Sequence, residues 1–549
     1  MRPFVATLIG GSLLFLLAAP VVAQKPASRP ATRPATRPAT LPATRPLPPS
    51  DRVPTLVVFI TVDQLREDYF TRYASQLTGG LGRLARGGAF FTNAMLDYAT
   101  TETAPGHATG MSGRFPRSTG IVSNTLGVYD PQAPVIGSTT TFASPFRFRG
   151  GTLIDWLRIK DARSSALSVS RKDRGAILPL GRAHQGAYWY DPASGAFTTS
   201  TYYADTLPTW LRTYNARRVP ASYAGAVWQP LLPDSAYAEP DSVVWENFGS
   251  NFVFPHPLPA DTAAAVLGLA EMPFMDEVTL QVALTGMKNM NLGAGTWTDV
   301  LAISLSTTDQ IGHRYGPDSR EMHDQILRLD RALGAFMDSL YAVRDPTRVV
   351  IALTADHGIA PIPELYTATN HKPTQRVDLA SVAKRYQQAL MARGADPVDF
   401  AFSEAMLSIR RASLERAGVN VDSVERAFRT EIRAMPGVAR VDRLADLPKD
   451  TARDPIARRW YHSVPPDFSV ELVVTLQPFS VWGTYAPGIH GSPYDYDNQV
   501  PVIFYGAAFK AGQYRTPARV VDMAPTLAWV TATVPAERVD GSVLWSVLK

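Results

Sequence analysis

Runs of apolar, mostly β-branched residues recur along the chain and predict strands that are buried on both faces of a sheet. The first run covers residues 55–62, and similar runs cover residues 300–305, 349–353 and 500–505. Continuous apolar runs of this length are typical of parallel strands that helices cover on both sides.

A helical period lies between two of these runs. Six apolar residues recur there at spacings of three and four, namely Met322, Ile326, Leu329, Leu333, Phe336 and Leu340. We expect Asp318 and Glu321 to cap the start of this helix, and Asp324 and Asp330 to lie on its solvated face. Residues 520–530 predict another helix. Strands that alternate with helices favour an α/β fold, with a doubly wound, mostly parallel central sheet and helices on both faces.

Two regions interrupt the alternation of strands and helices. Residues from about 180 to 290 are rich in Tyr, Trp and Pro, and residues from about 365 to 485 have their own short elements. We interpret both as insertions in one catalytic domain that spans residues 53–549. A small separate α+β module at residues 410–480 is an alternative that the sequence leaves open.

The N-terminal segment predicts export. Residues 1–23 combine a basic start, an apolar run and a small-residue cleavage site, as a signal peptide does. An uncleaved membrane anchor is the alternative, but two glycines and a proline interrupt the apolar run. Residues 24–52 are rich in Pro, Arg and Thr, and we expect them to form a disordered linker of polyproline II character. We therefore expect a periplasmic or secreted protein with no stable membrane span after cleavage.

Composition narrows the possible chemistry. The 549 residues include no cysteine, which excludes disulfides, a cysteine nucleophile and thiolate metal ligands. Residues 1–50 hold six of the 54 basic residues and no acidic one, so 48 basic residues face 49 acidic ones in the remainder. The net charge of +5 is thus a property of the tail. It does not indicate nucleic acid as a partner.

Carboxylates and imidazoles follow the predicted strands. Asp63 follows the first run, and two Asp/His pairs follow the runs at residues 300–305 and 349–353. Sites in open α/β sheets form beyond the carboxyl ends of the strands. A further histidine lies in a glycine-rich loop near the end of the second insertion. The candidate ligands are Asp63, Asp309, His313, Asp356, His357 and His490.

These side chains suit zinc at catalytic sites with open positions, and there are enough of them for two ions. Two ions about 4 Å apart can stabilise both the attacking and the leaving oxygen of a phosphoryl transfer. Each residue alone could be an ordinary turn or helix cap, and the specificity lies in their combined order. We interpret the remaining histidines as structural or surface groups, namely His107, His184, His256, His323, His371 and His462.

Thr103 stands just before a proline at the start of a short predicted helix. A hydroxyl at that position lies beside the free N–H groups of the first turn, where anions such as phosphate bind. A simple N-cap is the alternative.

The ordered motifs of the chain resemble the alkaline phosphatase superfamily. The similarity is to the branch of nucleotide pyrophosphatases/phosphodiesterases and phosphate-irrepressible bacterial alkaline phosphatases. It covers the chain from about residue 53 to the C-terminus. The motifs are Asp63, Thr103-Ala104-Pro105-Gly106-His107, Gly120-Ile121-Val122-Ser123-Asn124, Asp309-x-x-x-His313, Asp356-His357-Gly358 and His490-Gly491.

The resemblance implies a role for each motif. Thr103 would be the nucleophile, and Asn124, twenty-one residues later, would bind the transferred phosphoryl group. Two Zn²⁺ ions are implied. Thr103, Asp63, Asp356 and His357 would hold the zinc beside the nucleophile. The zinc on the leaving-group side would be held by Asp309, His313 and His490.

A Lys-x-Arg pair decides the substrate class that the resemblance implies. The bacterial phosphatases have such a pair in their first inserted region, and Lys172 and Arg174 match it. Both cations suit the dianion of a phosphate monoester. We expect a monomeric alkaline phosphatase that hydrolyses small phosphate monoesters through a phosphothreonine intermediate.

Two alternatives stay open. A phosphodiesterase or nucleotide pyrophosphatase could use the same two-zinc site, with the Tyr/Trp-rich first insertion as an apolar surface for its second ester group. A non-enzymatic binding protein on the same scaffold is the other.

Overall fold

The computed structural model covers most of the predicted catalytic domain. The predicted signal peptide at residues 1–23 and most of the linker at residues 24–52 lie outside the described residues. None of the helices in the described part of the chain combines the length and the apolar character that a bilayer crossing needs. The structure describes residues 47–49, 52–447, 453–484 and 486–549.

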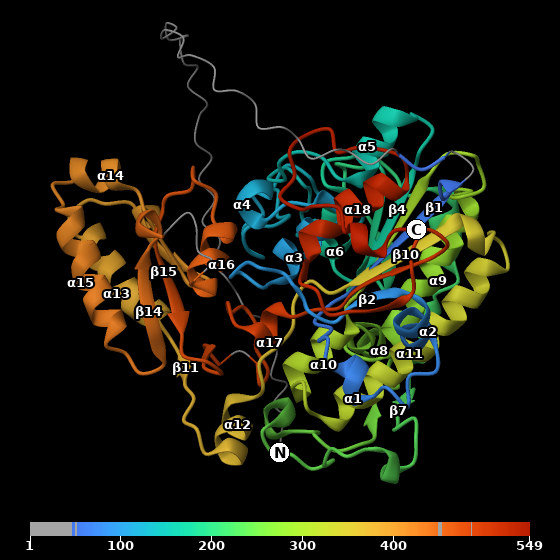
Figure 1. Cartoon of the computed structure of the whole chain (residues 1–549). Coiled ribbons are helices and arrows are strands. Elements are labelled where there is room, and N and C mark those ends of the chain that lie inside the picture. The colour runs from blue at the N-terminus through green and yellow to red at the C-terminus, as the bar shows by residue number, and fades with distance from the viewer. Residues whose placement is uncertain (1–46, 50–51, 448–452, 485) are drawn as a thin grey trace, which may run out of the picture. The chain divides into compact units, whose positions relative to one another are not determined.

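A nine-stranded sheet forms the centre of the molecule (Figure 1). Its apolar strands are almost completely buried, as the continuous apolar runs predict. The predicted α/β fold is confirmed. In spatial order the strands are β18 (Gly512–Tyr514), β2 (Ala89–Phe91), β17 (Val502–Tyr505), β10 (Val349–Thr354), β1 (Leu56–Val62), β9 (Asp299–Leu305), β4 (Ala166–Ser170), β5 (Gly186–Asp191) and β6 (Ala196–Thr198).

The middle of this sheet is parallel. Strand β1 pairs in parallel with β10 and β9, and β4 pairs in parallel with β9 and β5. Strand β17 is antiparallel to both of its neighbours. In the register of the parallel strands, Thr61 lies opposite Thr354 and Ser304, and Ser304 lies opposite Ser170. The carboxyl ends of β10, β1, β9 and β4 therefore meet at one edge.

Two groups of helices lie on opposite sides of this sheet (Figure 1). Within each group the helices pack on one another. The first group consists of α2 (Gly80–Gly87), α9 (Phe274–Asn289), α10 (Thr307–Tyr315) and α11 (Arg320–Tyr341). The second consists of α3 (Thr103–Ser112), α5 (Leu153–Lys160), α6 (Asp173–Ile177) and α18 (Met523–Val530).

Short elements connect the larger ones. In the first insertion, β5 and β6 extend the central sheet, and α9 packs against it. The other elements of that insertion are α7 (Thr209–Ala216), α8 (Thr262–Leu269), β7 (Val227–Trp228) and β8 (His256–Pro257). Elsewhere lie α1 (Tyr69–Arg72), α4 (Pro116–Thr119), α12 (Pro363–Asn370), α16 (Pro455–Ser463), α17 (Asp495–Asn498), β3 (Ala94–Met95) and β19 (Ala518–Arg519).

The expected cap of helix α11 was wrong. Ser319 is the N-cap, and its hydroxyl accepts a hydrogen bond from the Met322 N–H. Asp318 instead pairs with Arg72 at 2.9 Å, and Glu321 turns inward to the His256 ring at 2.9 Å. A serine hydroxyl satisfies the first turn, so both acids are available for tertiary contacts.

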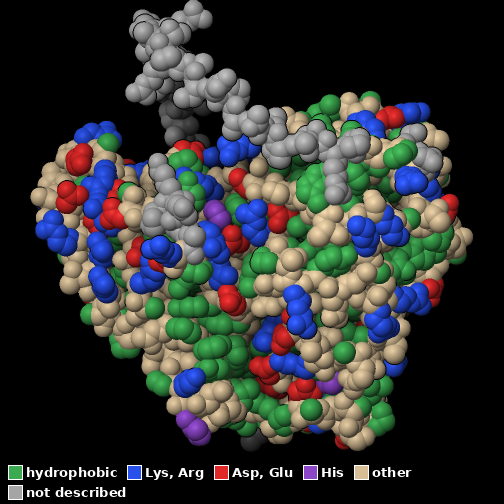
Figure 2. Space-filling view, in the orientation of Figure 1, with side chains coloured by type: hydrophobic (Ala, Val, Ile, Leu, Met, Phe, Trp, Pro, Cys, Tyr) green, Lys and Arg blue, Asp and Glu red, His purple; other side chains and the backbone are tan. Residues whose placement is uncertain are grey.

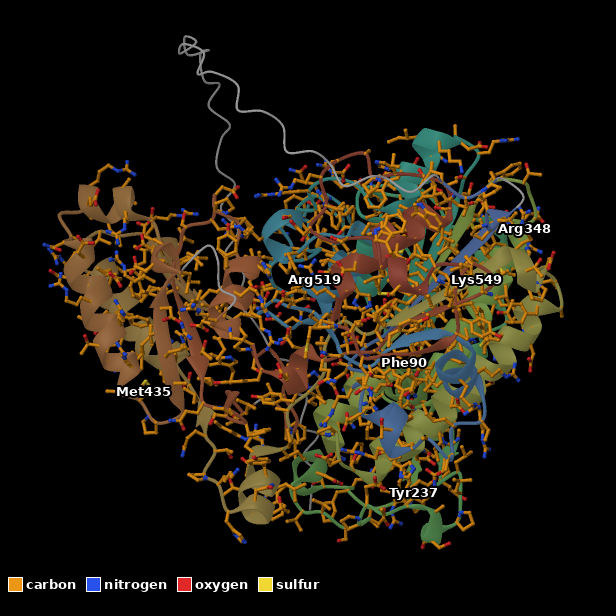
Figure 3. All side chains as sticks on the ribbon, in the orientation of Figure 1. Phe90, Tyr237, Arg348, Met435, Arg519 and Lys549 are labelled. Atoms are coloured by element: carbon orange, nitrogen blue, oxygen red, sulfur yellow. The ribbon has the colours of Figure 1, made fainter. Side chains whose placement is uncertain are left out.

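The expectation that Asp324 and Asp330 face solvent was also wrong, because both are buried. Asp330 accepts hydrogen bonds from two N–H groups at the start of α2, and it thereby joins α2 to α11. Asp324 accepts from the Trp228 indole, the Tyr237 hydroxyl and a backbone N–H of the first insertion. Figure 3 labels Tyr237 of this insertion below the sheet residue Phe90. The hydrogen bonds of Asp324 thus connect helix α11 to the first insertion.

The second insertion contains a four-stranded sheet with its own hydrophobic core, which runs from Val377 to Leu476. Met435 marks this part in Figure 3. A second cluster joins Ala405 of this insertion to Val122, so the insertion also packs on the catalytic part. Its elements are β11 (Arg376–Val377), α13 (Ala380–Met391), β12 (Phe400–Ser403), β13 (Met406–Ile409), α14 (Arg411–Arg416), α15 (Val421–Arg433), β14 (Val438–Arg443), β15 (Val470–Leu476) and β16 (Val481–Trp482).

Charged side chains of both signs are interspersed on the face that Figure 2 shows. This mixture agrees with the near balance of charges that follows the tail in the sequence.

We expect the substitution Asp324→Ala to lower the free energy of unfolding by about 3–5 kcal/mol, because it leaves several buried donors without an acceptor. Asp338→Ala on the same helix is the control, since Asp338 is 63% exposed and pairs only with a surface arginine. It should cost less than about 1 kcal/mol. Urea unfolding measures both values, and equal losses would contradict the anchoring role of Asp324.

Candidate active site

The edge where the parallel strands end carries the predicted acidic and imidazole residues. Asp63 directly follows β1, and Asp356 and His357 follow β10. Asp309 and His313 lie one turn apart on α10, which follows β9. Because these strands are neighbours in register, their terminal residues converge from segments that are hundreds of positions apart.

The structure brings the six candidate ligands together as two groups. In the first, Asp63, Asp356 and His357 are completely buried, and each offers an atom within 4.8 Å of the others. The second group meets the same criterion and consists of Asp309, His313 and His490. The rings of His357 and His490 stack with centroids 3.6 Å apart, so the two groups are adjacent.

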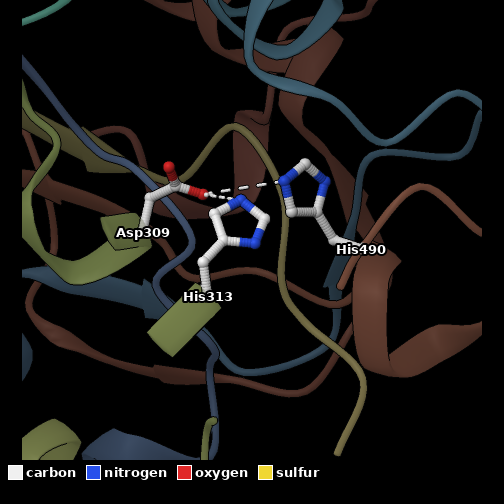
Figure 4. A group of neighbouring side chains, drawn as sticks. All are labelled: Asp309, His313 and His490. Carbon is white, nitrogen blue, oxygen red and sulfur yellow. Dashed lines mark ion pairs between the residues drawn. The ribbon is translucent and has the colours of Figure 1, made fainter. Parts of the chain in front are cut away.

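Figure 4 shows the second group, in which both rings turn toward one carboxylate. The Nε2 atoms of His313 and His490 lie 3.3 and 3.6 Å from Asp309 Oδ1. Their Nδ1 atoms bond at 2.8 Å to the carbonyl oxygens of Gly488 and Thr101. Such a carbonyl fixes the ring so that Nε2 points into the site, which is the usual arrangement of metal-binding histidines.

The first group also fits a cation. The His357 Nδ1 bonds to a backbone carbonyl. Asp63 Oδ1 and Asp356 Oδ2 lie 3.3 and 3.7 Å from His357 Nε2, and all three atoms are buried. Burial alone would lower the pKa of His357, but Asp356 and Asp63 outweigh it and raise that pKa to about 10. The negative charge of these two carboxylates, which raises the pKa of His357, would also attract a divalent cation.

Lys172 lies between the two groups. Its ammonium is 2.6 Å from Asp63 Oδ2 and 2.6 Å from Asp309 Oδ2, and it donates a hydrogen bond to Thr103 Oγ1 at 3.3 Å. Burial and Asp309 oppose ionisation of Asp63, but Lys172 and His357 outweigh them and lower its pKa. Burial also opposes ionisation of Asp309, and Lys172 again prevails, so the pKa of Asp309 is well below its ordinary value.

Thr103 is the first residue of α3, and Glu102 occupies the N-cap position. The Thr103 hydroxyl is therefore not the cap, and it faces Lys172 instead. Asn124 Oδ1 accepts a hydrogen bond from the Ala104 N–H at 2.9 Å. The Asn124 N–H donates to Glu102 Oε2 at 2.8 Å. These contacts hold the predicted nucleophile and the predicted phosphoryl-binding amide side by side.

Helix α3 approaches the first ligand group very closely at Gly106. A Cβ atom there would lie 2.3 Å from Asp356 Cβ and 2.4 Å from the Asp356 carbonyl oxygen. Any side chain at this position would move a candidate ligand, so the approach depends on glycine.

Two residues that the sequence reasoning missed support the ligand groups. His107 lies one turn after Thr103, and its Nδ1 is 3.1 Å from Asp356 Oδ2. Gln64 contacts both groups, because its backbone N–H donates to Asp356 Oδ1 and its amide donates to Asp309 Oδ1. Its φ of 68° lies in the left-handed region, which is uncommon for a residue with a side chain. The sequence signal of Gln64 was its position next to Asp63, and that of His107 was its helical spacing from Thr103.

A cavity of about 590 Å³ opens above the site. Thr103, Asn124, Lys172 and Arg174 line one end of it, together with the whole second ligand group. Arg174 lies in the first turn of α6, directly after β4. Four neighbouring strands thus contribute to one site.

The fold and the paired groups of oxygen and nitrogen ligands define a family of metal-dependent phosphoesterases. The chain belongs to the type I phosphodiesterase / nucleotide pyrophosphatase family, whose family model matches residues 57–450. The resemblance predicted from the motifs is confirmed.

Within this family the chain is similar to bacterial alkaline phosphatases. It is 32% identical to alkaline phosphatase PafA of Elizabethkingia meningoseptica, over 86% of this chain and 91% of that protein. It is 30% identical to alkaline phosphatase PhoV of Synechococcus elongatus, over 89% and 92% of the two chains. The crystal structure of wild-type PafA matches with a TM-score of 0.84 at 30% identity, over 90% of this chain and 99% of that one.

We expect Gln64→Ala to weaken metal binding by about 10- to 100-fold, because residues behind metal ligands orient them. Gln76→Ala is the matched control, since Gln76 is a part-buried glutamine whose hydrogen bonds go to Ala236 and His323. Competition with a chromophoric chelator measures the affinity. Unchanged affinity in Gln64→Ala would show that Gln64 does not position the ligands.

Proposed function

We propose that the protein is an exported, zinc-dependent phosphate monoesterase that acts through a phosphothreonine intermediate. The observation that carries this proposal is the position of Lys172, whose ammonium lies between the Thr103 hydroxyl and both ligand groups. Arg174 lines the same cavity. Two cations of the protein thus face the place where a phosphoryl group would meet the nucleophile.

The presence of two cationic side chains, Lys172 and Arg174, favours a monoester substrate over a diester. A monoester has a dianionic phosphoryl group, whereas a diester has one negative charge and a second organic group. Lys172 and Arg174 can bind the additional oxygen charge, and a guanidinium can do so with two parallel hydrogen bonds.

Two Zn²⁺ ions fit the ligand groups in number and in ligand type. Asp63, Asp356, His357 and Thr103 would hold one, and Asp309, His313 and His490 would hold the other. When bound, the ions would lower the pKa of hydroxyl groups and offset charge on the attacking and leaving oxygens.

The chain's own residues account for the remaining steps. The Thr103 oxygen attacks phosphorus in line, so that an O–P bond forms while the bond to the leaving alcohol oxygen breaks. Water then attacks the phosphorus of the phosphothreonine. This step releases inorganic phosphate and regenerates the Thr103 hydroxyl. Asn124, Lys172 and Arg174 hold the non-bridging oxygens throughout, and they stabilise charge that spreads over them in the transition state.

The relatives support this proposal. PafA, PhoV and a Sphingomonas relative are named alkaline phosphatases. A solved fourfold mutant of PafA has substitutions at a threonine, at an asparagine 21 positions later, and at a lysine and an arginine two positions apart. Thr103 and Asn124, and Lys172 and Arg174, have the same identities and spacings.

Two further properties belong to the proposal. The signal-like N-terminus favours a periplasmic or secreted enzyme. We also propose that the enzyme acts as a monomer on small substrates.

We expect Thr103→Ala to lower kcat for an aryl phosphate by at least about 10³-fold, as the loss of a nucleophile does in other hydrolases. Wild-type enzyme quenched in acid should carry phosphate on Thr103 in mass spectra. Thr109→Ala is the control, because this threonine lies in the same helix and its hydroxyl donates only to Pro105 O. Full activity in Thr103→Ala would rule out the mechanism.

We expect Arg174→Ala to lower monoester turnover by about 10²-fold and diester turnover by less, since the diester lacks the second charge. The measurement is kcat/KM for an aryl phosphate and for the matching methyl aryl diester. Arg163→Ala, a surface arginine 62% exposed, should change neither value. Equal losses on both substrates, or a wild-type preference for the diester, would favour the phosphodiesterase alternative.

A further inference from the structure

The cavity above the site has a second wall that the proposed mechanism does not use. This wall comes from the second insertion and includes Val377, Leu379, Phe402 and Trp482. We propose that it binds the leaving group of the substrate, and that it selects a flat, uncharged, apolar group such as an aromatic ring. The inference rests on the proposed function and names the class of monoester that the enzyme prefers.

The position of the wall assigns it to the leaving group. The cavity is lined by the complete second ligand group, Asp309, His313 and His490, and by Thr103, but by no member of the first group. A phosphoryl group at Thr103 would therefore direct its leaving oxygen toward the second group and the wall behind it.

The wall offers ring surface on a rigid base. Phe402 and Trp482 are partly exposed, with ring centroids 6.1 Å apart and ring planes inclined by 60°. Val377 and Leu379 beneath them are 3% and 1% exposed. Trp482 ends strand β16, which pairs with β11, and Phe402 lies in β12. An aromatic ring that contacts both side chains would gain burial and edge-to-face contacts.

A tight turn fixes this wall to the phosphoryl site. Glu404 and Ala405 join β12 to β13, and their φ values are 50° and 69°. Two-residue hairpin turns of this kind prefer Asn and Gly, so the chain keeps an unfavourable turn here. Ala405 is buried in the same hydrophobic cluster as Val122, and Glu404 accepts a hydrogen bond from Thr125 Oγ1 at 3.2 Å. Both contacts reach the loop that carries Asn124.

Acidic residues beside the wall disfavour anionic leaving groups. Asp378 and Glu404, both from the second insertion, line the cavity together with the wall. A carboxylate or a second phosphate on the leaving group would face these acids. The cavity is large enough for a phosphoryl group together with a ring.

The first insertion does not provide this surface. Among the described residues that line the cavity, the first insertion contributes none from positions 180–290. The aromatic side chains of that insertion therefore lie outside the lining of this cavity. Trp228, for example, is buried against Asp324.

The test compares benzyl phosphate with ethyl phosphate, because their alcohols are similarly poor leaving groups and differ by the ring. In Trp482→Ala, we expect kcat/KM for benzyl phosphate to fall about three- to tenfold relative to that for ethyl phosphate. Binding of benzylphosphonate, measured by calorimetry, should weaken by the same factor relative to ethylphosphonate. Phe402→Leu should act in the same direction. Trp245→Ala is the matched control, since this tryptophan of the first insertion is 40% exposed.

Several outcomes would overturn the assignment. They are equal losses on both monoesters, a selective effect in Trp245→Ala in place of Trp482→Ala, and a loss confined to diesters, which would assign the wall to a second ester group. Circular dichroism identifies a misfolded variant, in which case Phe402→Leu decides. Phosphonate binding needs no turnover, so failure of the wall is separable from failure of the proposed function, which Thr103→Ala tests.

Discussion

The site depends on the compensation of buried negative charge. Asp63 and Asp356 of one ligand group and Asp309 of the adjacent group are fully or almost fully buried. Carboxylates in such surroundings ionise only where cations balance them. Lys172 supplies one fixed positive charge, and the arrangement of the histidines suits divalent ions for the rest. Binding of a phosphate dianion is possible only because this local balance can become positive.

Much of the fold could be predicted because the central strands have nearly continuous apolar sequences. Such strands leave few alternatives to a parallel sheet covered by helices, and residues at their carboxyl ends must then converge. The positions of Asp63 and Asp356 at the edge of the sheet could therefore be predicted from the strand ends, although only the combined motifs indicated their roles. His490 is different, because it lies in an irregular glycine-rich loop, and only the family resemblance assigned it to the second ligand group.

Contacts between segments that are distant in the sequence could not be predicted from the pattern of apolar and polar residues. Helical periodicity assigned Asp324 and Asp330 to the solvent side, because no pattern reveals that an insertion will cover that side. The only sequence signal of Gln64 was its position next to Asp63, and its importance arises from the register that places it between Asp309 and Asp356. The cavity wall was missed because short strands of the second insertion build it.

The way the chain assembles this site has a consequence for folding kinetics. Gln64 binds Asp356 across 292 positions of sequence, and the His490 ring is fixed by Thr101 across 389. Pairing of such distant segments must await nearly the whole polypeptide and closes very large loops, which slows folding. An incomplete chain would present the Asp63 strand without its β10 neighbour, as an unpaired apolar edge. Nascent molecules should therefore depend on chaperones to avoid aggregation until the last ligand has emerged.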